Sequence, residues 1–244
     1  MADAWWDPIE VAVGSSWSRP IGKGTLTIEH DAFEWRIGVE TTEAAQPPAS
    51  LRIATDSDDC ALTLGPRLAD RSVVARLEVP LRIAAGDRAT IYVGSPLWAE
   101  VQLGSSSTEA VGELRFYDPP NTWFGPNTRE GELCYASRTT GRLRRDVIEH
   151  QGDRAITPVV ISNLSDAPLV FERVRIPIPR LTLWLADDES LWTNRLLINH
   201  SKEVSDEIET KAPTALDVGE FRELAGPREV AETNLFTRAI GALL

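Results

Sequence analysis

Apolar and polar residues alternate in short runs from the start of the chain to about residue 200, and clusters of Gly, Pro, Asn and Asp separate the runs. A period of two places successive side chains on opposite faces of a β-strand. The pattern therefore predicts an all-β protein, and we expect an antiparallel β-sandwich.

Three of these runs predict specific features. Thr25 to His30 (TLTIEH) and Phe33 to Val39 (FEWRIGV) flank a turn-like segment at residues 29–32, so we expect them to form a hairpin. Val73 to Ile83 also alternates, but Pro80 has no amide donor. We expect that strand to bend at Pro80 or to lie there at the edge of a sheet.

A second series of alternating runs follows a Gly-Ser linker at residues 104–107, at 159–162, 169–178, 181–185 and 191–198. Leu77–Pro80 is similar to Val174–Pro177, and Leu97-Trp98 is similar to Leu191-Trp192. This similarity predicts two tandem sandwich-like halves, at residues 1–106 and 107–200. Chance recurrence of short apolar motifs in a strand-rich chain is the alternative.

The character of the chain changes after His200. Residues 201–219 are polar, acidic and interrupted by Pro213, which predicts a flexible tether. Residues 229–244 place apolar side chains, including Phe236 and Ile240, on one face at helical spacing, which predicts a short amphipathic helix. Such a helix either covers its own domain or binds a partner.

Charge and composition limit the function classes. The formal net charge of −12 disfavours binding to nucleic acid and to anionic membranes. The apolar runs are far shorter than the roughly 20 residues of a membrane-spanning helix, so we expect no integral membrane segment. The first residues lack the pattern of a signal peptide, and we expect a cytoplasmic protein. Cys60 and Cys134 are expected to be buried free thiols.

Aromatic side chains and turn-forming residues concentrate in the segment from Asp118 to Asn127 (DPPNTWFGPN). Its three prolines predict a stiff, ordered loop and no strand. Trp123 and Phe124 on such a loop favour recognition of a ligand or of a partner's pocket. Alternatively, both side chains fold under the loop and cap one end of the sandwich.

A dense arginine cluster follows this loop. Its members lie within eight residues that contain no acid: Arg138, Arg142, Arg144 and Arg145. If Gly141 closes a hairpin, Arg142 and Arg144 share one face of a strand. The guanidinium groups suit phosphate or carboxylate ligands. In the alternative interpretation they pair with nearby acids, namely Glu130, Glu132, Asp146 and Glu149.

The sequence offers little support for catalysis, metals or cofactors. The three histidines are far apart and form no zinc motif, and residues 56–59 lack the glycine and the distal glutamate of a calcium loop. We therefore assign no catalytic residue, no metal site and no cofactor, and we favour a protein that is not an enzyme. A novel site that uses Glu130, Glu132 and His150 stays open as an alternative.

The stretch WFGPNTREGELCYA from Trp123, together with Ile156 to Trp184, resembles the uncharacterised prokaryotic family catalogued as domain of unknown function 432. The resemblance covers about residues 110 to 200. It implies no established activity and no catalytic residues. Members of this family tend to be encoded beside small-conductance mechanosensitive channels, which implies an accessory or interaction role.

The leading hypothesis is a non-enzymatic cytoplasmic accessory protein that binds a protein partner, with a link to such a channel. The alternative is a binding module for a carbohydrate or a small anion, which uses Trp123 and the arginine cluster. The candidate binding residues are drawn from the aromatic loop, the arginine cluster and the predicted terminal helix: Trp123, Phe124, Arg138, Arg142, Arg144, Phe236 and Ile240.

Overall fold

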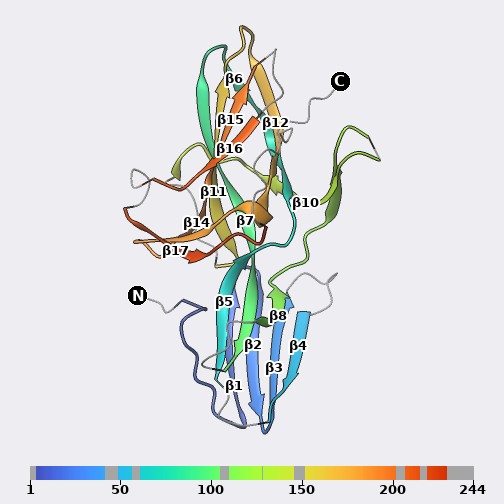
Figure 1. Cartoon of the computed structure of the whole chain (residues 1–244), viewed down its shortest axis with the longest axis vertical. Coiled ribbons are helices and arrows are strands. Elements are labelled where there is room, and N and C mark those ends of the chain that lie inside the picture. The colour runs from blue at the N-terminus through green and yellow to red at the C-terminus, as the bar shows by residue number, and fades with distance from the viewer. Residues whose placement is uncertain are drawn as a thin grey trace. The chain divides into compact units, whose positions relative to one another are not determined.

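The chain forms an all-β protein in a computed structural model (Figure 1), which confirms the predicted class. The strands pair into antiparallel and mixed sheets. The structure describes residues 4–41, 49–56, 61–104, 110–127, 129–145, 152–201, 207–214 and 219–229.

The chain divides into two compact units, and each unit is assembled from three separate segments. Unit 1 comprises Met1–Arg67, Pro96–Asp118 and Gln151–Arg154. Unit 2 comprises Leu68–Ser95, Pro119–His150 and Ala155–Leu244. These units differ from the sequential halves 1–106 and 107–200 that the sequence suggested, because the chain passes from one unit to the other several times.

Unit 1 contains a four-stranded antiparallel sheet with the order β1-β2-β3-β4. Its strands are β1 (Ser15–Ile21), β2 (Gly24–Asp31), β3 (Glu34–Thr41) and β4 (Ala49–Ala54). The predicted hairpin is confirmed as the pairing of β2 with β3, and its two-residue turn lies at Ala32 and Phe33. Phe33, the second residue of this turn, has a positive φ of 62°.

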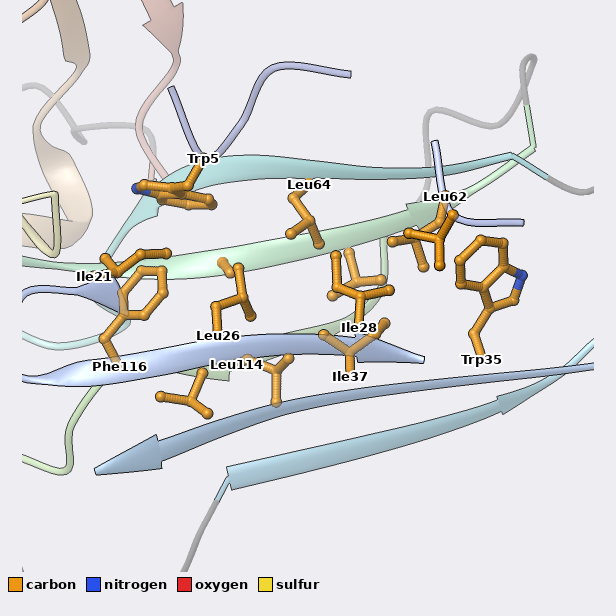
Figure 2. Close-up of a cluster of buried hydrophobic side chains, with 14 residues drawn as sticks. Trp5, Ile21, Leu26, Ile28, Trp35, Ile37, Leu62, Leu64, Leu114 and Phe116 are labelled. Atoms are coloured by element: carbon orange, nitrogen blue, oxygen red, sulfur yellow. The ribbon is translucent and has the colours of Figure 1, made fainter. Parts of the chain in front are cut away.

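The second layer of unit 1 consists of β5 (Leu62–Leu68), the later part of β7 (Arg88–Leu103) and β8 (Ala110–Arg115), which belong to a nine-stranded sheet. Alternate side chains of both sheets form a buried apolar core, which Figure 2 shows between the strands. The largest members include Trp5, Trp35 and Phe116. Unit 1 is therefore a β-sandwich, whose inner faces bury the apolar half of each alternating run.

Unit 2 contains a mixed sheet with the order β12-β6-β10-β9. Its strands are β6 (Val73–Ile83), β9 (Asn121–Phe124), β10 (Glu132–Thr139) and β12 (Leu169–Ile176). β6 pairs with β10 in parallel, whereas the other two pairs are antiparallel. One face of this sheet, which includes Val73, Ala75 and Val174, is buried and apolar, and Arg76 and Arg138 lie on the opposite, outer face.

The other strands of unit 2 form a series with the order β16-β15-β11-β14-β13-β17. They are β11 (Arg154–Asn163), β13 (Leu183–Ala186), β14 (Leu191–Thr193), β15 (Arg195–His200), β16 (Glu207–Lys211) and β17 (Phe221–Ala225). Trp192 is fully buried among Tyr92, Trp184 and Phe221. A 3-10 turn over Ile178–Arg180 follows β12.

The segment predicted as a flexible tether contains a strand, so that prediction is wrong in part. β16 pairs with β15 and places Ile208 opposite Ile198. Cross-strand pairing and this apolar contact outweigh the polar composition that suggested a tether. The predicted helix over residues 229–244 lies outside the described residues, except for Glu229.

The expected irregularity at Pro80 is confirmed. β10 pairs with β6 only as far as Leu77, so one side of β6 is unpaired at Pro80, and the register with β12 shifts between Phe171 and Arg173. The segments proposed as duplicates, in contrast, take different structures. Pro80 lies within a strand and is exposed, whereas Pro177 is buried and precedes the 3-10 turn.

Candidate functional site

Part of the predicted aromatic loop is a strand. Asn121–Phe124 forms β9 and pairs with the first half of β10, so the expectation that Asp118 to Asn127 contains no strand is wrong. The prolines lie on either side of β9, at 119, 120 and 126. The four residues between them keep their amide donors, and this is sufficient for a short edge strand.

Trp123 of β9 and Leu133 of β10 lie directly opposite each other in the register of this hairpin. Both are unusually exposed for large apolar side chains, at 44% and 47% respectively. The indole Nε1 of Trp123 donates a hydrogen bond of 2.8 Å to the Asn127 carbonyl. Trp123 is therefore held in place and faces solvent, and we call Trp123 and Leu133 the hairpin patch.

The turn of the hairpin is fixed by short-range hydrogen bonds. Asn127 Oδ1 accepts from the amides of Arg129 at 2.8 Å and Glu130 at 2.9 Å. A Cβ on Gly125 would lie 2.1 Å from the Glu130 carbonyl, so the two arms approach too closely for a side chain there. Phe124 is half-buried on the opposite face of β9 from Trp123. The hairpin patch is thus presented on an ordered turn.

β9 ends the order of its sheet, so it is an edge strand. Its four residues are bounded by Pro120 on one side and by Gly125 and Pro126 on the other. Short edge strands with flanking prolines resist the addition of a further strand. Recognition at this hairpin would therefore use side chains more than backbone hydrogen bonds.

An ion pair with one buried member lies on the outer face of the same sheet. The guanidinium of Arg175 on β12 is 5% exposed and donates to both carboxylate oxygens of Glu132, from Nε to Oε1 and from Nη2 to Oε2 at 2.8 Å. Burial opposes ionisation of Glu132, but hydrogen bonds from Arg175 and Ser72 hold its pKa below the ordinary value. Glu132 is therefore ionised at neutral pH and paired with Arg175.

Cys134 is a buried free thiol, as predicted, and it adjoins this pair. Its Sγ lies 3.2 Å from Glu132 Oε1. Burial, together with the neighbouring carboxylate, raises the pKa of Cys134 to about 12. Both effects favour the protonated thiol over the nucleophilic thiolate. Cys60 lies outside the described residues.

A pocket of about 140 Å³ opens beside the pair, where β6 begins and β12 ends. Arg71, Arg175 and Arg180 line it together with three acids: Asp70, Glu132 and Glu229. The charges compensate one another, because Arg180 lies 3.3 Å from Glu229 and Arg71 lies 3.9 Å from Asp70. The pocket therefore has little net charge with which to attract an ion.

Arg138, predicted from the arginine cluster, lies on the outer face beside two arginines that are distant in the sequence. Arg138 of β10 is the register partner of Arg76 of β6, and Arg76 is the partner of Arg173 of β12. We call these three residues the arginine row. No local sequence signal marks Arg76 or Arg173, because strand pairing alone brings the three together.

The other cluster members do not join Arg138. Gly141 has a positive φ of 57°, but the described residues directly beyond it, 142–145, form only an isolated bridge between Arg142 and Tyr92. The expected hairpin face shared by Arg142 and Arg144 is therefore absent from the described residues. Arg145 forms an ion pair of 3.2 Å with Asp188.

Trp123 is the register partner of Leu133 and shares its face of the sheet. Side chains alternate along β10, so Leu133 and Arg138 point to opposite faces, and Trp123 and Arg138 therefore lie on opposite faces as well. A single ligand that stacks on Trp123 does not reach Arg138 across the sheet. Glu130 lies in the turn outside β10, so it does not share a strand face with Glu132 as the enzymatic alternative assumed. His150, Phe236 and Ile240 lie outside the described residues.

The fold defines an all-β protein built from a β-sandwich and a second, mixed-sheet unit, with an exposed apolar hairpin patch. The chain belongs to the family described as Protein of unknown function (DUF432), whose model matches residues 5–243. The resemblance noted over residues 110 to 200 thus extends over nearly the whole chain. No curated protein and no solved structure matches it. No helix among the described residues is long and apolar enough to span a membrane.

Proposed function

We propose that this protein is a non-enzymatic accessory protein that binds a protein partner through the hairpin patch. The exposure of Trp123 and Leu133 at opposing positions of an ordered hairpin carries the proposal. Large apolar side chains that stay exposed in a fixed geometry are typical of interaction surfaces. The hydrogen bonds within the turn lower the entropy lost on binding, because the patch is already ordered.

The partner to test first is a small-conductance mechanosensitive channel. Genes for such channels tend to lie beside those of family members, as the sequence resemblance implies. The acidic charge of −12 favours a protein partner over nucleic acid. We propose in addition that the protein is located in the cytoplasm.

Binding of the full-length chain to the purified, detergent-solubilised channel encoded nearest to its gene tests the proposal. Biolayer interferometry compares the wild type with the double variant Trp123→Ala, Leu133→Ser. We expect the variant to bind at least about thirtyfold more weakly, the effect of losing an aromatic hot spot of about 2 kcal/mol. The matched control is Val79→Ala, Leu164→Ala, which removes two side chains that are 78% and 63% exposed in the same unit.

Equal affinities of the wild type and the hairpin variant would contradict the proposed surface. The predicted terminal helix needs a separate variant, Phe236→Ser, Ile240→Ser, in the full chain. Truncation after Gly219 is unsuitable because it removes β17, which pairs with β13. Loss of binding in the Phe236, Ile240 variant would add the terminal segment to the contact surface.

Carbohydrate binding is a second candidate function, favoured by the exposed indole of Trp123. Aromatic rings of this kind stack on the faces of sugar rings. Titration of a glycan panel, monitored by tryptophan fluorescence, distinguishes this function from the first when wild type and Trp123→Phe are compared. Saturable quenching that is absent in Trp123→Phe would favour the carbohydrate ligand.

A further inference from the structure

The arginine row places three positive charges at one level of the sheet. Arg173, Arg76 and Arg138 are successive register partners across β12, β6 and β10. Neighbouring strands lie about 4.8 Å apart, so the row extends across roughly 10 Å of the sheet surface. Register partners direct their side chains to the same face, and the three guanidinium groups therefore share one surface.

That surface is the solvent side of the sheet at this level. The residues adjacent to the row, Ala75 and Val174, point to the inner face and are 1% exposed. Arg76 and Arg138 are exposed, and Arg173 is half-buried. The row is therefore accessible to a ligand from solvent.

No acidic side chain among the described residues neutralises the row. Within the part of the chain that the structure describes, none of the three guanidinium groups forms an ion pair or a hydrogen bond. Glu132 lies on the same face, but Arg175 occupies both of its oxygens. Glu78 and Glu172 are nearby in sequence and pair with none of the three. Like charges at opposing positions of a sheet repel, so the row opposes folding in the absence of a ligand.

An irregularity in the pairing of β6 with β12 creates the row, because residues 77–80 of β6 stand opposite the single residue Glu172 of β12. Phe171 pairs with Leu81, and continuation of that register would place Arg173 opposite Val79. The register shift between Phe171 and Arg173 instead moves Arg173 opposite Arg76. Bulges of this kind are frequent beside functional sites, where they redirect a side chain. The register shift therefore places Arg173 beside Arg76, which the regular register would not do.

We infer that the arginine row binds a short chain of phosphate groups, such as a diphosphate or triphosphate. Each guanidinium offers a planar fork of donors that matches two phosphate oxygens. Two neighbouring arginines suffice for a single phosphate, whereas a linear chain of phosphates engages all three members of a linear row. This site is independent of the hairpin patch, and it does not rest on the proposed protein partner.

Isothermal titration calorimetry of the full chain with inorganic tripolyphosphate tests the inference. We expect saturable binding that is tighter than the binding of orthophosphate and weakens as salt is added. ATP in a parallel titration distinguishes a nucleotide from a free phosphate chain, since a nucleotide site binds ATP at least as tightly as tripolyphosphate. Absence of binding to both, or equally tight binding of citrate, would overturn the assignment to a phosphate chain.

Matched variants locate the site. Arg76→Gln and Arg138→Gln should each weaken the binding of tripolyphosphate about tenfold or more, because each removes charged hydrogen bonds. The control is Arg82→Gln, which removes the same charge from an exposed position of the same strand outside the row. Glu78→Gln should strengthen binding, since it removes a nearby negative charge. Equal loss in Arg82→Gln and Arg76→Gln would show attraction to net charge alone and overturn the site.

Discussion

The outer sheet faces of the two units use arginine in opposite ways. In unit 1, Arg36 of β3 and Arg52 of β4 are register partners, as Arg76 and Arg138 are in unit 2. Glu34 lies between the unit 1 pair, 2.5 Å from Arg36 Nε and 2.6 Å from Arg52 Nη2. Asp31 also lies within 3.1 Å of Arg36. No such acid neutralises the described arginine row of unit 2.

The comparison shows that exposure alone does not explain the row. The chain has 37 acidic residues against 25 basic ones, and the face of unit 1 shows that it can place carboxylates between neighbouring arginines. Unit 2 has an acid on the relevant face, yet Glu132 is committed to the buried Arg175. The unpaired row is thus better explained by an external anion than by a solvated surface.

The largest expected change in stability follows from removing the carboxylate that pairs with the buried Arg175 of unit 2. Glu132→Ala leaves the buried Arg175 without its carboxylate, and we expect it to lower the free energy of unfolding by about 3 kcal/mol. Urea denaturation measures this loss. Glu78→Ala, an exposed acid of the same sheet, is the control and should change stability by no more than about 0.5 kcal/mol. Equal effects of the two substitutions would contradict a structural role for the Arg175 pair.

An intermediate loss of stability is expected when the acid between the neighbouring arginines of unit 1 is removed, which leaves them unpaired like the arginine row of unit 2. Hydrogen bonds from Arg52, opposed by burial and reinforced by Arg36, lower the pKa of Glu34 to about 2. This stabilisation is present above the ordinary pKa of 4.5 and is lost as the pH falls through the folded value. Glu34→Gln should therefore lower the urea midpoint at pH 7, and its difference from wild type should vanish near pH 2. A difference that is the same at both pH values would refute the assignment.

The smallest expected change in the free energy of unfolding comes from neutralising one arginine in each unit, and its sign differs between the two units. Arg76→Gln removes the central charge of the row and should raise the free energy of unfolding by about 0.5 kcal/mol, because like charges at opposing sheet positions repel. Arg36→Gln removes a charge that is paired with acids, so it should lower stability. Thermal or urea unfolding of both variants checks the signs. A destabilising Arg76→Gln would indicate an unrecognised acidic partner for the row.

Much of the fold could be predicted from the alternation of apolar residues. β2 and β3 alternate strictly, so their hairpin and buried face follow from the sequence. β9 could not be predicted because its four residues lie among three prolines, and β16 because Ile208 is its one apolar residue. Both strands form because neighbouring strands supply their hydrogen bonds, which local composition does not reveal.

The candidate sites were only partly predictable for a similar reason. Trp123 and Arg138 were identified from local aromatic and arginine density. Leu133, Arg76 and Arg173 were not, because their importance depends on strand register. In particular, the parallel pairing of β10 with β6 and the register shift between β6 and β12 bring together residues from three distant segments. No periodicity in one segment specifies such pairing.

The urea midpoint of wild type and Arg76→Gln, each measured with and without tripolyphosphate, tests the central claim about the arginine row most directly. Without the ligand, Arg76→Gln should be the more stable protein. With saturating ligand, the wild type should gain more stability than the variant through tighter binding to the folded state and become the more stable of the two. Equal gains in both proteins, or an Arg76→Gln variant that is less stable without ligand, would contradict the claim that the row is a site for a phosphate chain.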